Sequence, residues 1–195
     1  IKIDDITREV LSTEVFVLKK DAQADISDQA CYDIIISANW AYVACRFKFK
    51  DPTFNQIQVY TVNLDTMTLG ELYAVTNNGK VKGSFRMSMA NFGVNFARKM
   101  IFFYDGGVPT TTAGSVFFVS AFIKEGNPSS LEAGKEYNLA TILQTPTLDG
   151  NVRHIAQYSS GTVFVVTGLT GAAPQSLHFS TLKFESDGSL TQDVF

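Results

Sequence analysis

Short apolar runs separated by turn-forming residues recur along this chain and predict β-strands. The runs 34–36, 101–103 and 163–166 are apolar at consecutive positions. Because neighbouring residues of a strand point to opposite faces of its sheet, such runs predict strands that are covered on both faces. Helical patterns are weak: residues 129–132 resemble a capping box, but Gly134 limits any helix there to about one turn. The expected fold class is all-β.

The predicted strands recur in antiparallel, four-stranded units of about 60 residues. The first turn of each unit falls near residue 38, 98 or 160. In the second unit we expect the first strand at 92–96 and the last near 137–143. The predicted organisation is an N-terminal strand segment followed by three β units, over 1–30, 31–90, 91–150 and 151–195.

The first and third units resemble blades of a β-propeller of the lactonase and YVTN type. In the first unit the resemblance rests on 37–44 and 57–66, a small turn followed by an aromatic-valine strand and a partner strand that ends in Asp. In the third it rests on the turn at 186–190. The resemblance implies propeller-blade-like sheets. Propellers usually close with about 4–8 blades, so the ring would be completed by further chain or other subunits. A β-sandwich or jelly-roll would accept the same strands.

Composition and charge narrow the possible functions. The chain has 195 residues, of which 45% are hydrophobic and 18% charged, so it can form a core and is not disordered. Its net charge of −3 argues against a nucleic-acid partner, and no apolar run approaches the roughly 20 residues of a membrane span. The chain starts at Ile1 without Met, from which we expect either processing or a piece of a longer chain.

Cys31 and Cys45 flank the first predicted hairpin. In a hairpin whose turn is centred near Ala38, paired positions sum to about 76, and the two cysteines satisfy this sum. They would therefore face each other across the two strands. A disulfide is one interpretation, and two buried thiols are the other.

No catalytic constellation stands out among the polar residues. His154 and His178 lie in predicted strands among apolar neighbours, where a structural role is expected. A lactonase-type enzyme, as the resemblance implies, would bind a divalent metal through carboxylates. The candidates by residue type alone are Asp33, Asp65, Asp149 and Asp187. Asp65 and Asp187 suit turns equally well, so these carboxylates do not form a recognisable metal-binding group. With no catalytic constellation either, we predict no catalytic residue, no metal site and no cofactor.

Two surface features allow other interpretations. In Arg46–Lys50, cationic and aromatic residues alternate, so a strand would place the cations on one face. We expect this to be the solvent-facing end of a strand, although such a ribbon could also bind a glycan or single-stranded nucleic acid. Exposed aromatic residues such as Trp40 or Tyr104 would suit a carbohydrate-binding module.

The two ends of the chain suggest self-association. The predicted strand at 12–18 has no hairpin partner beside it, and the strand at 190–195 ends the chain. Unpaired edge strands invite pairing with another chain. The expected interaction residues are Val15, Phe16, Val17, Leu190, Val194 and Phe195. We therefore predict a non-catalytic, extracellular or cell-surface structural protein that self-associates into a fibre or closed oligomer, or binds another protein; the alternatives are a lactonase-like hydrolase and a carbohydrate-binding module.

Overall fold

The computed structural model describes residues 2–3, 10–12, 26–51, 56–76, 85–92, 98–105, 117–138, 142, 152–157, 163–169, 177–184 and 189–192. The described residues form three four-stranded antiparallel sheets and one short hairpin, which confirms the all-β class. The hairpin pairs β1 (Lys2–Ile3) with β2 (Val10–Ser12).

The first sheet contains β3 (Ile26–Ser37), β4 (Trp40–Phe49), β5 (Gln56–Asn63) and β6 (Thr68–Thr76) in chain order. Two of its three connections are tight turns. Ala38 and Met67 adopt positive φ angles of 52° and 54° in these turns. The Asn63 side chain accepts hydrogen bonds from the backbone N–H groups of Asp65 and Thr66, which fixes the second turn.

The second sheet contains β7 (Phe85–Phe92), β8 (Arg98–Asp105), β9 (Phe117–Ile123) and β10 (Leu131–Asn138). The strand that precedes the turn to β8 is thus Phe85–Phe92, not the expected 92–96. Polar residues interrupt β7, yet Met87 and Ala90 are buried in it, so its apolar pattern is weak in the sequence. Residues 93–96 lie outside the described part of the chain.

The capping-box pattern at 129–132 does not begin a helical turn. Leu131 begins β10, which pairs with β9 from Leu131 to Asn138. Ser129 and Ser130 belong to the preceding turn, where their backbone groups form hydrogen bonds with neighbouring strands and turn residues. Burial of Leu131 in the core favours an extended chain over a helical turn at this point.

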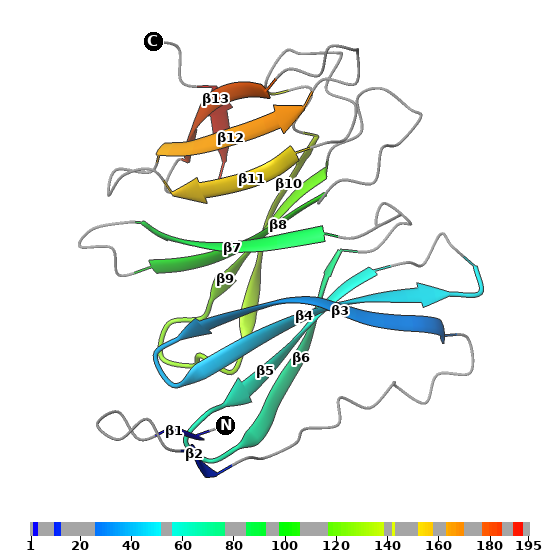
Figure 1. Ribbon diagram of the computed structural model, residues 1–195, viewed down its shortest axis with the longest axis vertical. Helices are drawn as coiled ribbons and strands as arrows, with labels where there is room; N and C mark the ends of the chain where they lie inside the picture. Colours follow the sequence, from blue (N-terminus) through cyan, green and yellow to red (C-terminus); the bar gives the residue numbers. More distant parts are fainter. Residues whose placement is uncertain are drawn as a thin grey trace.

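The third sheet contains β11 (Val152–Gln157), β12 (Val163–Leu169), β13 (Leu177–Phe184) and β14 (Leu190–Gln192). Like the first two, it is a meander in which each strand pairs with the next along the chain. The three sheets follow one another along the long axis of the molecule (Figure 1). Their first strands are neighbours, because β3 contacts β7 and β7 contacts β11.

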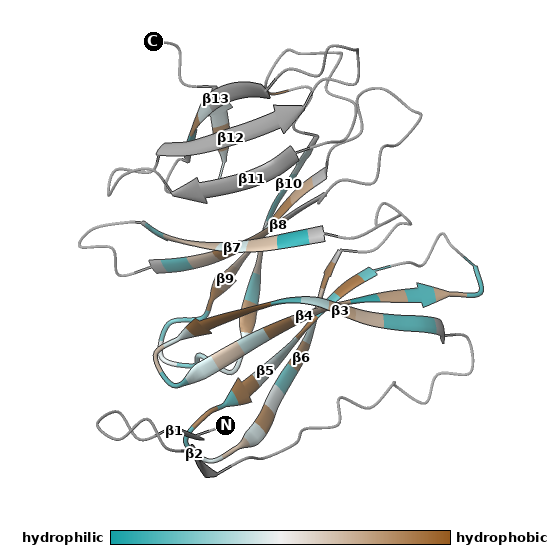
Figure 2. Cartoon of the chain, in the orientation of Figure 1, coloured by the Kyte–Doolittle hydropathy of each residue, from teal (hydrophilic) through white to brown (hydrophobic). Residues whose placement is uncertain are grey.

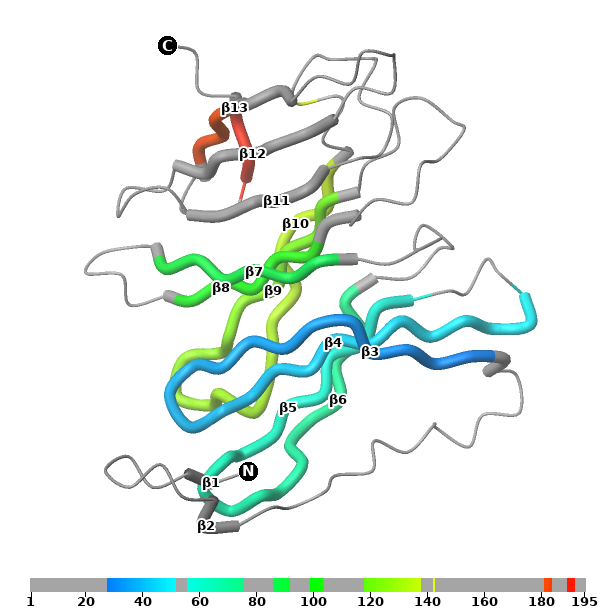
Figure 3. The backbone as a smooth tube through the Cα atoms, viewed as in Figure 1, coloured from blue at the N-terminus to red at the C-terminus, as the bar shows by residue number. Residues whose placement is uncertain are grey.

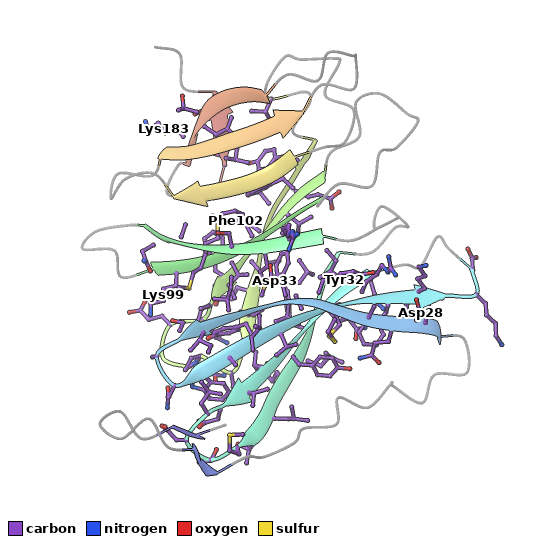
Figure 4. The ribbon with its side chains drawn as sticks, viewed as in Figure 1. Asp28, Tyr32, Asp33, Lys99, Phe102 and Lys183 are labelled. Carbon is purple, nitrogen blue, oxygen red and sulfur yellow. A yellow bond between two sulfur atoms is a disulfide. The ribbon has the colours of Figure 1, made fainter. Side chains whose placement is uncertain are left out.

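The main core lies between the first and second sheets. The first sheet contributes Tyr42, Ala44, Ile57 and Val59 from β4 and β5. The second sheet contributes a matching set, Met87, Ile101, Phe103, Val119, Ala121 and Leu131. Phe102 is buried on the opposite face of the second sheet, where its ring lies 5.4 Å from that of Phe118 (Figure 4). The consecutive run 101–103 is therefore covered on both faces, as the sequence predicted.

Candidate interaction surface

The first sheet has two faces with different partners. Its inner face, which carries Tyr42, Ala44, Ile57 and Val59, packs on the second sheet. Its outer face carries the residues that alternate with these along each strand.

The turn Lys124–Ser130, between β9 and β10, docks on the inner face of the first sheet (Figure 3). The Tyr42 hydroxyl donates a hydrogen bond to the Pro128 carbonyl over 2.9 Å. The Ser129 carbonyl accepts hydrogen bonds from the Thr61 hydroxyl at 2.9 Å and from the Glu71 backbone N–H at 3.3 Å. Buried hydroxyls of one sheet thus satisfy the backbone of a turn that belongs to another.

This docking requires a residue without a side chain at position 70. A Cβ added to Gly70 would lie 2.4 Å from Thr61 Oγ1 and 2.9 Å from the Ser129 Cβ. The docked turn is held in shape by its own hydrogen bonds, from Lys124 N to the Ser130 carbonyl and from Ser130 N to the Asn127 carbonyl. The close approach of β6 to this turn therefore depends on Gly70.

Asp33 and Lys99 add polar contacts between β3 of the first sheet and two strands of the second sheet, β7 and β8 (Figure 4). The Asp33 carboxylate accepts hydrogen bonds from the backbone N–H groups of Ile34 and Met87, each over 3.0 Å. Lys99 Nζ in β8 donates to the Ser37 hydroxyl over 2.7 Å. Asp33, a candidate metal ligand by residue type, therefore binds backbone amides at the junction of β3 and β7.

The outer face of the first sheet is apolar across all four strands. The strand register places two rows of residues side by side on it. One row is Ile36, Ala41, Val62 and Leu69, and the other is Ile34, Val43, Tyr60 and Leu72. The hydrophobic end of β3 stands out in brown in Figure 2.

The ends of these two rows are open to solvent. Ile34 is 55% exposed, Ile36 59%, Leu69 49% and Leu72 40%. Within the described residues, the exposed large hydrophobic side chains are these four, and all of them lie on the outer face. The prediction that 34–36 is covered on both faces is therefore wrong for β3. Ile35 points to the inner face and packs against the core between the first two sheets, whereas Ile34 and Ile36 point to the outer face of this edge strand.

The same outer face carries the cysteines. Of the two interpretations left open by the sequence, the structure has the disulfide, between Cys31 in β3 and Cys45 in β4. Cys45 is fully buried beside Phe47 and Tyr60, whereas Cys31 is exposed. The bond links the two strands where the register shifts, next to the exposed apolar rows.

Arg46 corrects the prediction for the cationic end of β4. Arg46 is only 7% exposed, and its guanidinium carbon lies 5.1 Å from the centre of the Tyr32 ring. Arg46 Nη2 lies 3.6 Å from an Asp28 carboxylate oxygen, which neutralises a charge that burial would otherwise penalise. Lys48 is half-buried and Lys50 exposed, so the solvent-facing interpretation holds for Lys50 but is wrong for Arg46.

Two tyrosines between the sheets have perturbed acidities. Burial raises the pKa of Tyr42 from 10.0 to about 12. Burial also raises the pKa of Tyr73, and the nearby Glu132 carboxylate raises it further. Both phenols stay neutral well above physiological pH, so Tyr42 remains a hydrogen-bond donor to the Pro128 carbonyl.

The structure does not gather the other candidate residues into one site. His154 and His178 pair with Thr167 and Gly168 of β12, and their side chains lie outside the described part. Asp65 accepts a hydrogen bond from the Asn39 side chain over 2.7 Å, which links two turns. Among the described residues, no group of three or more His, Cys, Asp or Glu could hold a metal ion.

Of the remaining residues that the sequence singled out, the side chains of Trp40 and Leu190 are described. Trp40 is half-buried, and its ring lies near Gly70. Leu190, in β14, is buried. The remaining predicted positions lie where the side chain or the whole residue is not described: Val15, Phe16, Val17, Tyr104, Asp149, Asp187, Val194 and Phe195.

A cavity of about 590 Å³ lies beside the docked turn. Its lining includes two lysines and two glutamates, Lys99, Lys124, Glu125 and Glu132. Because charges of both signs line it, the cavity has no evident preference for a ligand of one charge.

Comparison of the chain with known proteins identifies no relative from which a function could be transferred. No protein-family model matches the chain, and no curated protein matches its sequence. In the described part of the chain, no helix is both long and apolar enough to cross a membrane. The sequence interpretation missed the outer face of the first sheet. No simple alternation marks it, because 34–36 is apolar at consecutive positions and Leu69 and Leu72 share a face only through a shift in register.

Proposed function

We propose that this chain is a non-catalytic structural module that self-associates, and that its sheets are successive blades of an incomplete, propeller-like arrangement. The observation that carries the proposal is the outer face of the first sheet. Four large hydrophobic side chains are 40–59% exposed there, on one side of one sheet. Ile34 and Ile36 lie at one edge of that sheet and Leu69 and Leu72 at the other, and exposed large hydrophobic side chains gathered on one face support an interaction site there.

The sheet arrangement supports the propeller-like part of the proposal. Each sheet is a four-stranded meander, and the first strands β3, β7 and β11 neighbour one another in chain order. Successive propeller blades have the same order of elements, with their first strands around a common axis. The described residues form three such sheets, fewer than the roughly 4–8 blades of a closed propeller, so the ring would be completed by further chain or by other subunits.

The disulfide supports an extracellular or cell-surface location. The Cys31–Cys45 bond joins neighbouring strands, and disulfides persist mainly in oxidising compartments. A structural module assembling outside the cell would gain stability from this bond without needing a larger core.

The native mass of the purified chain tests the proposal. We expect light scattering to give a multiple of 21.4 kDa, and negative-stain microscopy to show closed rings or polymers. A monomer at all concentrations would overturn self-association. In that case the lactonase-like hydrolase and the carbohydrate-binding module become the next hypotheses, and lactones, divalent metals and glycans are the compounds to screen.

A further inference from the structure

We infer that β6, an edge strand of the first sheet, pairs antiparallel with β6 of a second copy of this chain, about a two-fold axis near Tyr73. This inference rests on the proposed self-association and names the strand responsible for it. Along one side β6 pairs with β5, and among the described strands no other pairs with it. The backbone groups on the outer side of an edge strand are a template for a further strand.

The side chains of β6 lie open to solvent along most of the strand. Leu69 is 49% exposed and Leu72 is 40% exposed. No described side chain of β6 is buried, whereas residues 57–62 of the neighbouring strand β5 are all buried. The edge of the sheet is therefore accessible to a partner where its centre is not. The exposed residues of β6 are Thr68, Leu69, Gly70, Glu71, Leu72 and Ala74.

The corresponding strand of the second sheet has a different chemistry. Like β6, β10 is the fourth strand of its sheet and lies at an edge, but it carries Glu132, Lys135 and Glu136, all of them exposed. Charged side chains on an edge strand discourage pairing with another chain. In β6 the one charged residue is Glu71, and there is neither Lys nor Pro. The edge suited to pairing is therefore β6 rather than β10.

The other edges of the three sheets indicate that β6 of one copy would pair with β6 of another. The first strands β3, β7 and β11 lie against one another, so neighbouring sheets already occupy these edges. The charges of β10 disfavour pairing, and β14 (Leu190–Gln192) has only three residues. A second copy therefore offers β6 as its most suitable edge. Pairing of identical strands is the arrangement that a two-fold axis produces.

The irregularities of β6 locate the pairing along the strand. Register shifts with β5 flank residues 72–74, and the Glu71 N–H already donates to the Ser129 carbonyl. Regular pairing would therefore centre on Tyr73, with Leu72 of each copy opposite Ala74 of the other. Both side chains are exposed in the single chain, so the pairing would cover apolar surface. Because the paired stretch is short, we expect a weak dimer that depends on concentration.

Lysine substitutions at matched positions of β6 and β10 test this inference. In Ala74→Lys, the new side chain would lie opposite Leu72 of the partner and near the partner's own new lysine, so we expect the dissociation constant to rise at least tenfold. The control Ala133→Lys adds the same side chain at an exposed position of β10 and should leave association unchanged. Sedimentation equilibrium across a range of concentrations measures association, and circular dichroism checks folding.

A mixture of two charge variants tests the two-fold arrangement. Ala74→Glu alone should weaken association as Ala74→Lys does, because like charges would lie on both sides of the axis. In an equimolar mixture, a lysine of one copy would lie near a glutamate of the other, and association should be at least tenfold tighter than in either variant alone. A mixture that associates no better than its components would overturn pairing about this axis.

The wild-type chain provides a test that needs no substitution. Backbone amides of residues 72–75 should exchange hydrogen more slowly at high protein concentration than at low concentration, whereas those of β10 should not change. Exchange in β6 that is independent of concentration in an associating chain would overturn this inference alone. The same holds if Ala74→Lys has no effect on association or if Ala133→Lys weakens it equally, because another surface is then used. A monomeric wild-type chain overturns both this inference and the proposed self-association.

Discussion

The Asp33 carboxylate in β3 accepts a hydrogen bond from the Met87 backbone N–H in β7 over 3.0 Å, joining the first strands of two sheets. Those strands belong to different sheets, so the strand ladders do not provide this bond. The carboxylate also accepts a bond from the Ile34 N–H. One side chain therefore satisfies two backbone donors at the junction of the sheets.

Substitutions of Asp33 should show how much these two hydrogen bonds contribute to the free energy of unfolding. We expect Asp33→Leu to lower the free energy of unfolding by about 1–3 kcal/mol, because the Met87 N–H loses its acceptor. Asp33→Asn keeps one carbonyl oxygen and should cost less. Urea unfolding of both variants measures the difference. Equal stability of the wild-type chain and Asp33→Leu would show that this bond contributes nothing to the packing of β3 on β7.

Gly70 should tolerate no side chain. We expect Gly70→Ala to lower the free energy of unfolding by about 1–3 kcal/mol, because the new methyl group would collide with Thr61 and Ser129. Gly126→Asn is the control in the docked turn. Gly126 has a φ of 73° but open space around its Cβ position, and Asn accepts such angles, so little change is expected. Thermal melts of the two variants provide the comparison.

Stability should fall at high pH through Tyr42. The pKa of its phenol is about 12 in the folded chain against 10.0 for the ordinary side chain, so the folded state holds this proton more tightly. The contribution is fully present below pH 10 and is lost as pH rises from 10 to 12. In Tyr42→Phe this part of the loss should disappear.

The Tyr42 substitution has a second effect at neutral pH. The Pro128 carbonyl loses its donor, which should cost about 1 kcal/mol. Guanidinium unfolding at pH 7 and at several values above pH 9 measures both effects. If the wild-type chain and Tyr42→Phe lost stability in parallel above pH 10, Tyr42 would not be the group responsible.

The disulfide should contribute to stability through the unfolded chain. The bond joins cysteines separated by 14 residues, and a loop of about this length is associated with about 3 kcal/mol. We expect the double variant Cys31→Ala/Cys45→Ala to unfold at a lower temperature than the wild-type chain. A reductant should lower the wild-type midpoint in the same way and leave the double variant unchanged. A midpoint that responds equally in both proteins would exclude the disulfide as the cause.

The pairing of Cys31 with Cys45 shows how far the sequence could predict the register. The hairpin turn consists of Ala38 and Asn39, and from Ser37 back to Asp33 the paired positions sum to 77. A strict continuation would pair Cys45 with Tyr32. The register shifts between Cys31 and Asp33, and only then does the sum become 76. The expected sum of 76 therefore matched the two cysteines only because Tyr32 is the extra residue of a bulge, which nothing in the sequence identified.

The pattern of apolar residues predicted where strands lie better than it predicted which side chains are buried. Apolar runs located most strands because local pattern determines which segments can be extended. They did not distinguish Ile101, which is buried in a central strand, from Ile36, which is 59% exposed in an edge strand. Likewise, Arg46 is buried because Tyr32 and Asp28 lie beside it. Such neighbours depend on pairing between distant segments, which a local pattern does not contain.

The docked turn also orders the steps by which the chain can fold during synthesis. The first sheet is complete at Thr76, but the Pro128 and Ser129 carbonyls that accept from Tyr42 and Thr61 are made later. Until the ribosome has released this turn, the inner face of the first sheet is uncovered and the Tyr42 hydroxyl lacks its native acceptor. Its native packing must therefore wait for the hairpin of β9 and β10, so the two sheets should gain protection from hydrogen exchange together.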